Sequence, residues 1–303
     1  MFQLLALFCC SLVFEKSEVI YTASINSNFR HFEFDRYIKD GSLLTGFSYG
    51  PRVNTKIVRT GKELSDVVPD NDFASSFLQL TPSLLLIVSS YKNCIKIFNR
   101  EENSTRMFAG VCNSIGFVDG PVGKFHSPES IDWNIKDRRF LLVTDQLNHA
   151  LRSVEISTGA VSTVVKSGFN WPSGFAWYNG RLLVLNQHYI SEVAWNGDNP
   201  TTNTMLTTTT SKGYHDGDFS MAQFNHPEEI IQLQKGYFLI SDSFNHKLRL
   251  LDMHRKRILP VPVGSTNACN ASSYLGWAPV SLLKDNDAVI FGMYKKITKL
   301  TGK

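Results

Sequence analysis

The sequence predicts an all-β protein built from a repeated unit. One long stretch of the 303-residue chain occurs twice, so that Asp119 and Asp145 in the first copy match Asp216 and Asp242 in the second at the same offset. Short turn sequences also recur between apolar runs along the whole chain, and no stretch has the pattern of a long helix. Internal periods of about 40 to 50 residues are typical of propeller blades. The sequence therefore predicts a six-bladed β-propeller that occupies residues 17–303 as a single domain.

The two copies of the repeat share their residue types from an Asp-Gly pair to an arginine. The first copy contains Asp119-Gly120, Phe125, Pro128-Glu129, Ile131, Asp145, Asn148-His149 and Leu151-Arg152. The second contains Asp216-Gly217, Phe224, Pro227-Glu228, Ile230, Asp242, Asn245-His246 and Leu248-Arg249. The pattern spans two apolar strands and the polar loop between them, so each copy covers most of one blade.

Tight turns divide the chain into blades. They are Asp40-Gly41, Thr81-Pro82-Ser83, Lys136-Asp137, Asn179-Gly180, Lys235-Gly236 and Asp285-Asn286. Asn-Gly and Asp-Gly favour two-residue hairpins because these turns need positive φ. We interpret each turn as the connection between the first two strands of a blade, which gives six blades.

The apolar runs predict the strands of each blade in order. Blade 1 contains residues 31–34 and 42–45, and blade 2 contains 77–80, 84–88, 95–98 and 106–108. Blade 3 contains Ile131 and residues 140–143, 151–156 and 161–165; blade 4 contains 174–177, 182–185, 192–195 and a strand near Thr207. Blade 5 is the second copy of the repeat. Blade 6 contains 280–283, 288–291 and 297–300, and is one strand short. We expect residues 18–23 to supply that strand and close the ring, which removes an open edge.

The Asp-x-x-Asn-His-x-Leu-Arg pattern, preceded by an Asp-Gly, Phe and Pro loop, resembles the NHL repeat. The resemblance is close in two copies and weaker elsewhere. It implies a β-propeller, in a family where six blades are common.

The repeated polar residues fall in loops on one face of the predicted disc, here called the top face. It carries the loops between strands two and three of each blade, and those between the last strand and the next blade. Asp145, Asn148, Asp242 and Asn245 are interpreted as structural residues that hold loop conformation. Arg152 and Arg249 are expected to pair with acids or backbone. Candidate binding residues on this face are Asp119, His149, His188, Asp216 and His246.

Two further candidates, Glu129 and Glu228, follow proline at the start of innermost strands and are expected to line the top of the central channel. They suit a cation such as calcium, as in the lactonase propellers, which this chain resembles only in fold. His149, His188 and His246 suit zinc, which three neutral imidazoles can hold with one position open. The peptide-amidating lyase is a related propeller with such a zinc, but its catalytic Tyr and Arg have no clear counterpart here.

The predictions for the cysteines and for the glycosylation sequons depend on secretion of the protein. Cys94 and Cys112 fall at the same end of the predicted third and fourth strands of blade 2, if Arg100 pairs with Thr105. Opposed strand residues have a Cα separation suited to a disulfide, so we predict a bridge between them. Cys269 is then left over. Asn103 and Asn270 lie in glycosylation sequons.

Residues 1–14 form an apolar run that ends at Glu15-Lys16, and its length fits a signal peptide rather than a membrane span, so we predict a signal peptide at residues 1–16. They lack a preceding Lys or Arg and a clear cleavage site, so a buried terminal strand is the alternative. The net charge of +4 is spread along the chain, which argues against RNA or DNA as a ligand. The sequence thus favours an extracellular, monomeric binding module for a protein or carbohydrate, without a cofactor. A zinc- or calcium-dependent lyase or hydrolase is the alternative.

Overall fold

A computed structural model describes residues 74–99, 101–196 and 199–261, together with strands β1–β5 and β23–β25 as backbone. The described chain is all-β. Apart from its strands it contains two short 3-10 helices, η1 (Gln146–Asn148) and η2 (Ser243–Asn245). No helix in this part of the chain is long and apolar enough to cross a membrane.

The described strands form antiparallel sheets that follow one another along the chain. The first contains β2 (Phe29–Tyr37), β3 (Leu43–Tyr49), β4 (Arg52–Arg59) and β5 (Lys62–Val68); the second contains β6 (Ser76–Gln79), β7 (Leu84–Ser89), β8 (Cys94–Asn99) and β9 (Ser104–Gly110). The third contains β10 (Pro128–Trp133), β11 (Phe140–Asp145), β12 (Ala150–Glu155) and β13 (Val161–Val165).

The fourth sheet contains β14 (Phe175–Tyr178), β15 (Arg181–Leu185), β16 (Ile190–Asn196) and β17 (Asn199–Met205). The fifth contains β19 (Pro227–Gln234), β20 (Tyr237–Asp242), β21 (Lys247–Asp252), β22 (Arg257–Pro260) and the short outer strand β18 (Gly217–Asp218). The last contains β23 (Leu282–Asp285), β24 (Ala288–Met293), β25 (Lys296–Thr301) and β1 (Lys16–Thr22).

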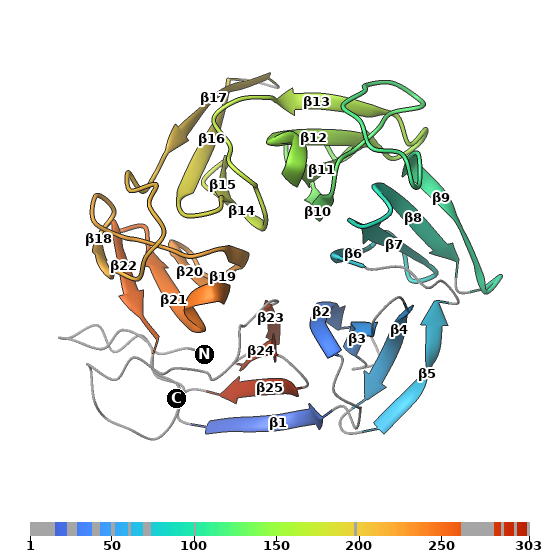
Figure 1. The fold of residues 1–303 in the computed structure, drawn as a ribbon, viewed down its shortest axis with the longest axis horizontal. Helices are drawn as coiled ribbons and strands as arrows, with labels where there is room; N and C mark the ends of the chain where they lie inside the picture. Colours follow the sequence, from blue (N-terminus) through green and yellow to red (C-terminus); the bar gives the residue numbers. More distant parts are fainter. Residues whose placement is uncertain are drawn as a thin grey trace.

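The sheets stand around a common centre, with β2, β6, β10, β14, β19 and β23 innermost (Figure 1). This arrangement of four-stranded antiparallel sheets is that of a β-propeller. Each turn predicted from the sequence falls between the first and second strands of a sheet. At Asn179-Gly180 both residues have positive φ, 48° and 78°, as a two-residue hairpin requires.

The strand nearest the N-terminus belongs to the last sheet. β1 pairs antiparallel with β25, from Lys16 opposite Thr301 to Thr22 opposite Lys296, with an irregularity between Val19 and Tyr21. This is the pairing that the apolar segment at residues 18–23 predicts with residues 297–300.

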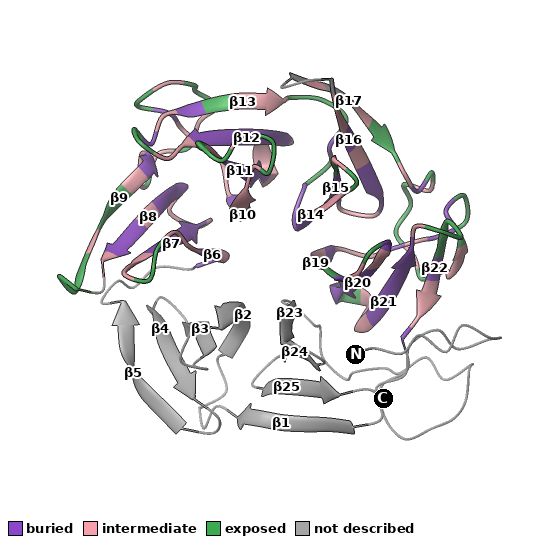
Figure 2. Ribbon diagram, turned by 180° about the vertical axis from the view of Figure 1, so that it is seen from behind, coloured by how far each residue is buried: buried purple, intermediate pink, exposed green. Residues whose placement is uncertain are grey.

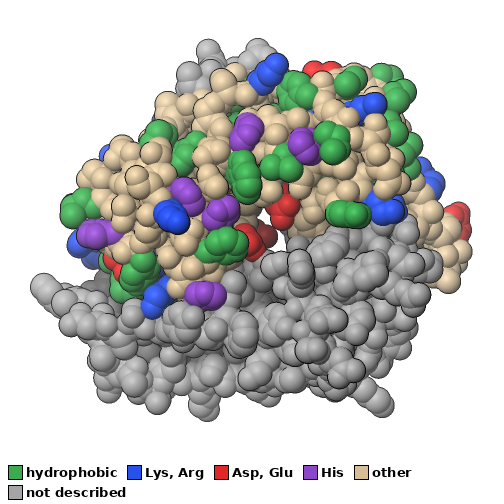
Figure 3. Space-filling model, in the orientation of Figure 1, with side chains coloured by type: hydrophobic (Ala, Val, Ile, Leu, Met, Phe, Trp, Pro, Cys, Tyr) green, Lys and Arg blue, Asp and Glu red, His purple; other side chains and the backbone are tan. Residues whose placement is uncertain are grey.

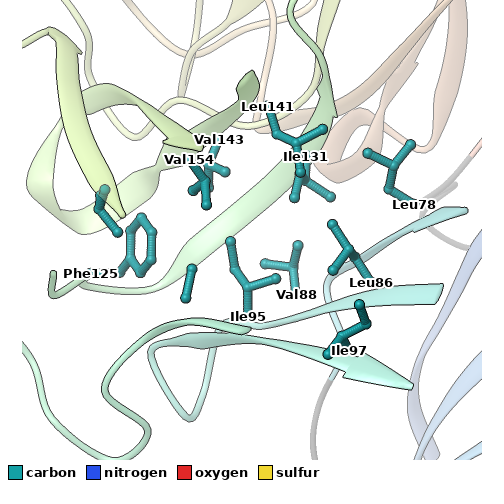
Figure 4. Close-up of a cluster of buried hydrophobic side chains, with 12 residues drawn as sticks. Leu78, Leu86, Val88, Ile95, Ile97, Phe125, Ile131, Leu141, Val143 and Val154 are labelled. Atoms are coloured by element: carbon teal, nitrogen blue, oxygen red, sulfur yellow. The ribbon is translucent and has the colours of Figure 1, made fainter. Parts of the chain in front are cut away.

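The hydrophobic core lies between neighbouring sheets. The second strands β7, β11, β15 and β20 are nearly continuous apolar runs, and their residues are buried on both faces (Figure 2). Between the second and third sheets, Val88 and Ile95 pack with Ile131 and Val143, and Phe125 reaches the same cluster from the connecting loop (Figure 4). The inner strand β10 is therefore fixed by packing between its own sheet and the second one.

The predicted disulfide between Cys94 and Cys112 is confirmed, with a Cα separation of 4.9 Å. The register used to predict it is wrong. Thr105 lies opposite Phe98 and not opposite Arg100 as predicted. The register then shifts between Ile95 and Lys96, so that Cys94 lies opposite Gly110. The bulge brings Cys112, just past the end of β9, back over Cys94.

Asn103 is exposed in the turn between β8 and β9, where its φ of 49° suits asparagine. Glycosylation there stays a prediction. Cys269, Asn270 and residues 1–15 of the predicted signal peptide lie outside the described residues.

Candidate functional site

Histidine side chains gather on the top face, which Figure 3 shows, while acidic side chains lie at the central opening. The histidines come from two kinds of loop. His149, His188 and His246 follow the second strands of three successive sheets, and His226 immediately precedes an innermost strand. Histidine and acidic side chains from three successive sheets thus share the top face of the described chain.

The repeated residues of the first copy form one hydrogen-bonded network. Asp145 accepts the backbone N–H of His126 through Oδ1, and accepts from Asn148 Nδ2 and Arg152 through Oδ2. Arg152 also donates to Asp119 at 2.6 Å and to the carbonyl of Val118. Asp145 and Arg152 are fully buried, which agrees with the structural role expected for them.

The second copy repeats these contacts. Asp242 accepts from the N–H of Asn225, from Asn245 Nδ2 and from Arg249, and Arg249 donates to Asp216 at 2.8 Å through Nε. Tyr214 donates its hydroxyl to the second oxygen of Asp216. In both copies the arginine also lies over aromatic rings, with Phe117 at 4.4 Å in the first and Tyr214 at 4.7 Å in the second.

These contacts set the ionisation of the acids. Burial raises the pKa of Asp145 and of Asp242, and is only partly offset by their hydrogen bonds and the arginine charges. Burial also opposes ionisation of Asp119, but hydrogen bonds from Arg152 and Thr163 outweigh it and lower the pKa of Asp119. Half of the Asp119 side chain and a quarter of Asp216 remain exposed, and their predicted role in ligand binding stays a prediction.

The predicted histidines have different surroundings. His149 and His246 end the 3-10 helices η1 and η2 with left-handed backbone, φ 52° and 55°. His149 accepts the backbone N–H of Trp171 through Nδ1 at 3.2 Å. His188 packs edge-on against His226, with ring centroids 5.3 Å apart.

His226, which the sequence analysis did not select, is the centre of a ring cluster. Its imidazole lies 4.6 Å from Phe244 and 5.9 Å from Trp171, both measured between ring centroids. We call Trp171, His188, His226 and Phe244 the aromatic cluster. Trp171 and Phe244 are exposed, at 39% and 55%, while the two histidines are partly buried. Large exposed aromatic side chains beside polar groups are typical of binding surfaces.

Amide groups fix the ring of His226. Nε2 of Gln187 lies 3.4 Å from Nε2 of His226, and Oε1 of Gln187 accepts from Asn170 Nδ2 at 3.0 Å. The amide nitrogen of Gln187 is therefore the donor and His226 Nε2 the acceptor, so the neutral ring carries its proton on Nδ1. Burial lowers the pKa of His226, and His188 lowers it further. Burial, with Lys212 as a smaller cause, also lowers the pKa of His188, so both rings are neutral at pH 7.

The backbone presents Trp171 and His226 in equivalent ways. Each precedes the proline before or at the start of an innermost strand and has left-handed φ, 50° for Trp171 and 49° for His226; Ser127 has φ 55° at the same position of the third sheet. Such a backbone costs a residue with a β-carbon about 1–2 kcal/mol. It is shared by all three sheets, so it belongs to the repeat, while the side chain that it carries varies.

The channel acids lie next to this cluster. Glu228 follows His226-Pro227 in the sequence. The side chain of Ser243, which is adjacent to Phe244, hydrogen-bonds to the Glu228 carboxyl group. Burial raises the pKa of Glu129 to about 7. Burial also raises the pKa of Glu228, and repulsion from Glu129 adds to the effect, because the two carboxyls lie close enough to interact.

The fourth sheet separates the two glutamates with small residues. Ser173 and Gly174 stand where the neighbouring sheets have Glu129-Ser130 and Glu228-Glu229. The N–H of Gly174 donates to the carbonyl of Glu228 at 2.8 Å, and a β-carbon at Gly174 would meet that oxygen at 2.5 Å. A residue without a β-carbon is needed at Gly174 for this close approach.

Within the described residues, no three His, Cys, Asp or Glu side chains converge as a metal ion would require. The His149 ring accepts a hydrogen bond from the backbone of Trp171, whereas the His188 ring packs against His226. A metal bound by His149, His188 and His246 would need these loops to rearrange.

Hollows also exist on the opposite face. One of about 430 Å³ lies among the turns between first and second strands, lined by Ile135, Trp177, Asn179, Gly180, Gln232, Leu233, Gln234 and Lys235. Another, of about 530 Å³, lies between the fourth and fifth sheets and includes Tyr178, Glu192 and Met253. Both are open, and neither contains the clustered histidines and acids of the top face.

No family model matches this sequence, and no curated protein matches it either. Solved structures do. An auxiliary nutrient binding protein from Bacteroides ovatus is similar over 95% of this chain and 73% of its own, with a TM-score of 0.68 and 14% identity. A gluconolactonase from Xanthomonas campestris is similar over 94% and 89%, with a TM-score of 0.64 and 11% identity. The virginiamycin B lyase of Staphylococcus aureus, with quinupristin, is similar over 95% and 99%, with a TM-score of 0.60 and 14% identity. At such identities the likeness shows the fold alone.

Proposed function

We propose that this chain is a secreted six-bladed propeller of the NHL type that acts as a binding module through its top face. The sheets follow one another around a common centre, and the pairing of β1 with β25 supports closure of the ring in the last blade. The disulfide between Cys94 and Cys112 supports secretion, since such bonds persist in oxidising compartments.

The aromatic cluster is the observation that carries this proposal. It places the exposed rings of Trp171 and Phe244 around His226, directly beside the channel acid Glu228. The residues that bind ligand are the cluster together with Glu129 and Glu228, flanked by His149, His246, Asp119 and Asp216. The ligand is a protein or a carbohydrate rather than a nucleic acid, and the module acts as a monomer. Similarity to a nutrient binding protein supports a binding role.

The alternative is a metal-dependent lyase or hydrolase in the same channel. Similarity of fold to a gluconolactonase and to virginiamycin B lyase supports it. Elemental analysis of the purified protein separates the two functions. Stoichiometric zinc or calcium that is lost in a variant lacking His188 or Glu129 would favour the enzyme.

A two-panel binding experiment tests the proposal. The purified protein is applied to a printed glycan array and to a peptide display library. A variant with Trp171→Asn and Phe244→Ser is compared with a variant of the opposite face, Ile135→Ser with Lys235→Ala. We expect binding on one panel that the top-face variant loses and the opposite-face variant keeps. Loss only in the opposite-face variant, or no binding on either panel, would reject the proposal.

A further inference from the structure

We propose that the top-face site takes a neutral carbohydrate, with sugar rings stacked on Trp171 and Phe244 and their hydroxyl groups bound by the polar side chains between and beside these rings. This inference rests on the proposed function and names the ligand class of that same site. Its support comes from the shape of the cluster, its hydrogen-bonding groups and its charge.

The shape suits a sugar. Trp171 and Phe244 both contact His226 but come from different loops, one before β14 and the other in η2. They flank a partly buried imidazole, and both are exposed. Apolar ring faces separated by a polar floor match a pyranose, which presents C–H groups on its faces and hydroxyl groups at its edges.

The floor between the rings offers donors and acceptors without charge. The amides of Gln187 and Asn170 hold one another and His226, and His188 packs against the same imidazole. Main-chain hydrogen bonds fix these groups, because the N–H of Gln187 donates to Asn170 and the N–H of His226 donates to Gln187, each at 2.8 Å. Neutral polar groups that are held in place before binding favour ligands with hydroxyl groups, because these side chains lose little conformational entropy when the ligand binds.

The local charge favours neither sign of ligand. Lys212 is near enough to His188 to affect its ionisation, while Glu228 and Glu129 lie on the channel side. An anion attracted by Lys212 would also lie near the glutamates, and a cation attracted by the glutamates would also lie near Lys212. A neutral ligand avoids both and still hydrogen-bonds to carboxyl groups, which accept and, when protonated, donate.

The repeat architecture explains why the described sheets differ in the side chain that they present at this position. The residue before the inner-strand proline has left-handed backbone in three successive sheets, yet its side chain is Ser127, Trp171 and then His226. The left-handed backbone at this position is the same in the three sheets, and the side chain that it carries determines which ligand can bind there. Trp171 is therefore the residue that determines specificity for a sugar ring.

Glycan binding to defined variants tests the inference. The probe is a printed array of neutral oligosaccharides of hexoses and N-acetylhexosamines, followed by calorimetric titration with the strongest binder. We expect Trp171→Asn to raise Kd by about tenfold or more. The variant loses one aromatic stacking contact and the apolar area that this contact buries. Trp171→Phe should retain part of the affinity, because a flat ring remains.

Trp171→Asn is suited to this test because asparagine accepts left-handed backbone and keeps the N–H that donates to His149. The control is Tyr91→Ser, which removes an aromatic residue, 76% exposed, from the loop between β7 and β8 of the second sheet, the kind of loop that carries Phe244 in the fifth. Unchanged affinity in Trp171→Asn, or peptides bound at the top face with no glycan bound, would overturn the carbohydrate assignment and leave the top-face module intact. Equal loss in Tyr91→Ser would place the site elsewhere and contradict both.

Discussion

Arg152 and Arg249 are the largest fully buried side chains of the described chain, and each donates hydrogen bonds to acids and carbonyl groups of its own repeat. We expect Arg249→Met to lower the free energy of unfolding by about 3–5 kcal/mol, because Asp242 is then left buried without its charge partner. Urea denaturation measures the change. Arg257→Ala, which breaks an exposed pair with Asp218, should cost less than about 1 kcal/mol. Equal effects of the two variants would contradict the structural role of the buried arginines.

The raised pKa of Glu129 makes a prediction for stability against pH. Its pKa is about 7 in the folded state and near 4.5 when unfolded. Between these values the folded protein binds more protons than the unfolded chain, so this group stabilises the fold below about pH 4.5 and that contribution is lost as pH rises through 7. The loss amounts to about 1–3 kcal/mol.

Glu129→Gln should remove this dependence, because glutamine is neutral at every pH. We expect the variant to be more stable than the wild type at pH 8 and nearly equal to it at pH 5. Thermal or urea unfolding at both values measures the difference. Comparison with the wild type cancels the contributions of His188 and His226, whose lowered pKa values act with the opposite sign when the pH falls below about 6.5. The difference reports Glu129 together with its effect on the pKa of Glu228. Parallel profiles for both proteins would show that Glu129 is not buried as described.

At the scale of single elements, the sequence predicted the strands and turns well because both depend on local chemistry. Asn179-Gly180 and Lys235-Gly236 join the strands that the apolar runs indicated. The register between β8 and β9 could not be predicted. The predicted pairing already fails at the turn, where Asn99 lies opposite Ser104, and the irregularity between Ile95 and Lys96 shifts the register once more. No residue type in this hairpin marks either position.

The disulfide holds the end of the β8–β9 hairpin together. Removing it with Cys94→Ser and Cys112→Ser should lower the free energy of unfolding by about 3 kcal/mol, since the bridge closes a loop with a sequence separation of 18. Amide exchange should also rise at Asn113, whose N–H donates to the carbonyl of Lys92 beside the bridge. Denaturation and exchange of the oxidised wild type supply the reference. An unchanged midpoint together with unchanged exchange at Asn113 would show that the bridge adds nothing to this loop.

At the scale of the whole molecule, the candidate site was only half predictable. The top face, His188 and the glutamates followed from the blade topology, because loops of one kind share one face. The aromatic cluster did not, since it joins Trp171, His226 and Phe244 from three separate loops. One signal was present in the sequence: Trp171-Pro172 and His226-Pro227 occupy the same place in successive repeats. Recognising it requires the blade alignment around Pro172, where the repeat is weak.

The pairing of β1 with β25 makes the last prediction. The paired residues run from Lys16 to Thr22, so a chain that begins at Asn28 lacks the outer strand of the last sheet and exposes the edge of β25. Unpaired edges associate with other chains, so we expect this truncated protein to aggregate and to lose its cooperative melting transition. Size-exclusion chromatography and calorimetry measure both effects. A chain that begins at Lys16 is the control and should stay monomeric with a cooperative transition, because it keeps all of β1. A monomeric truncated protein with unchanged melting would refute ring closure by β1.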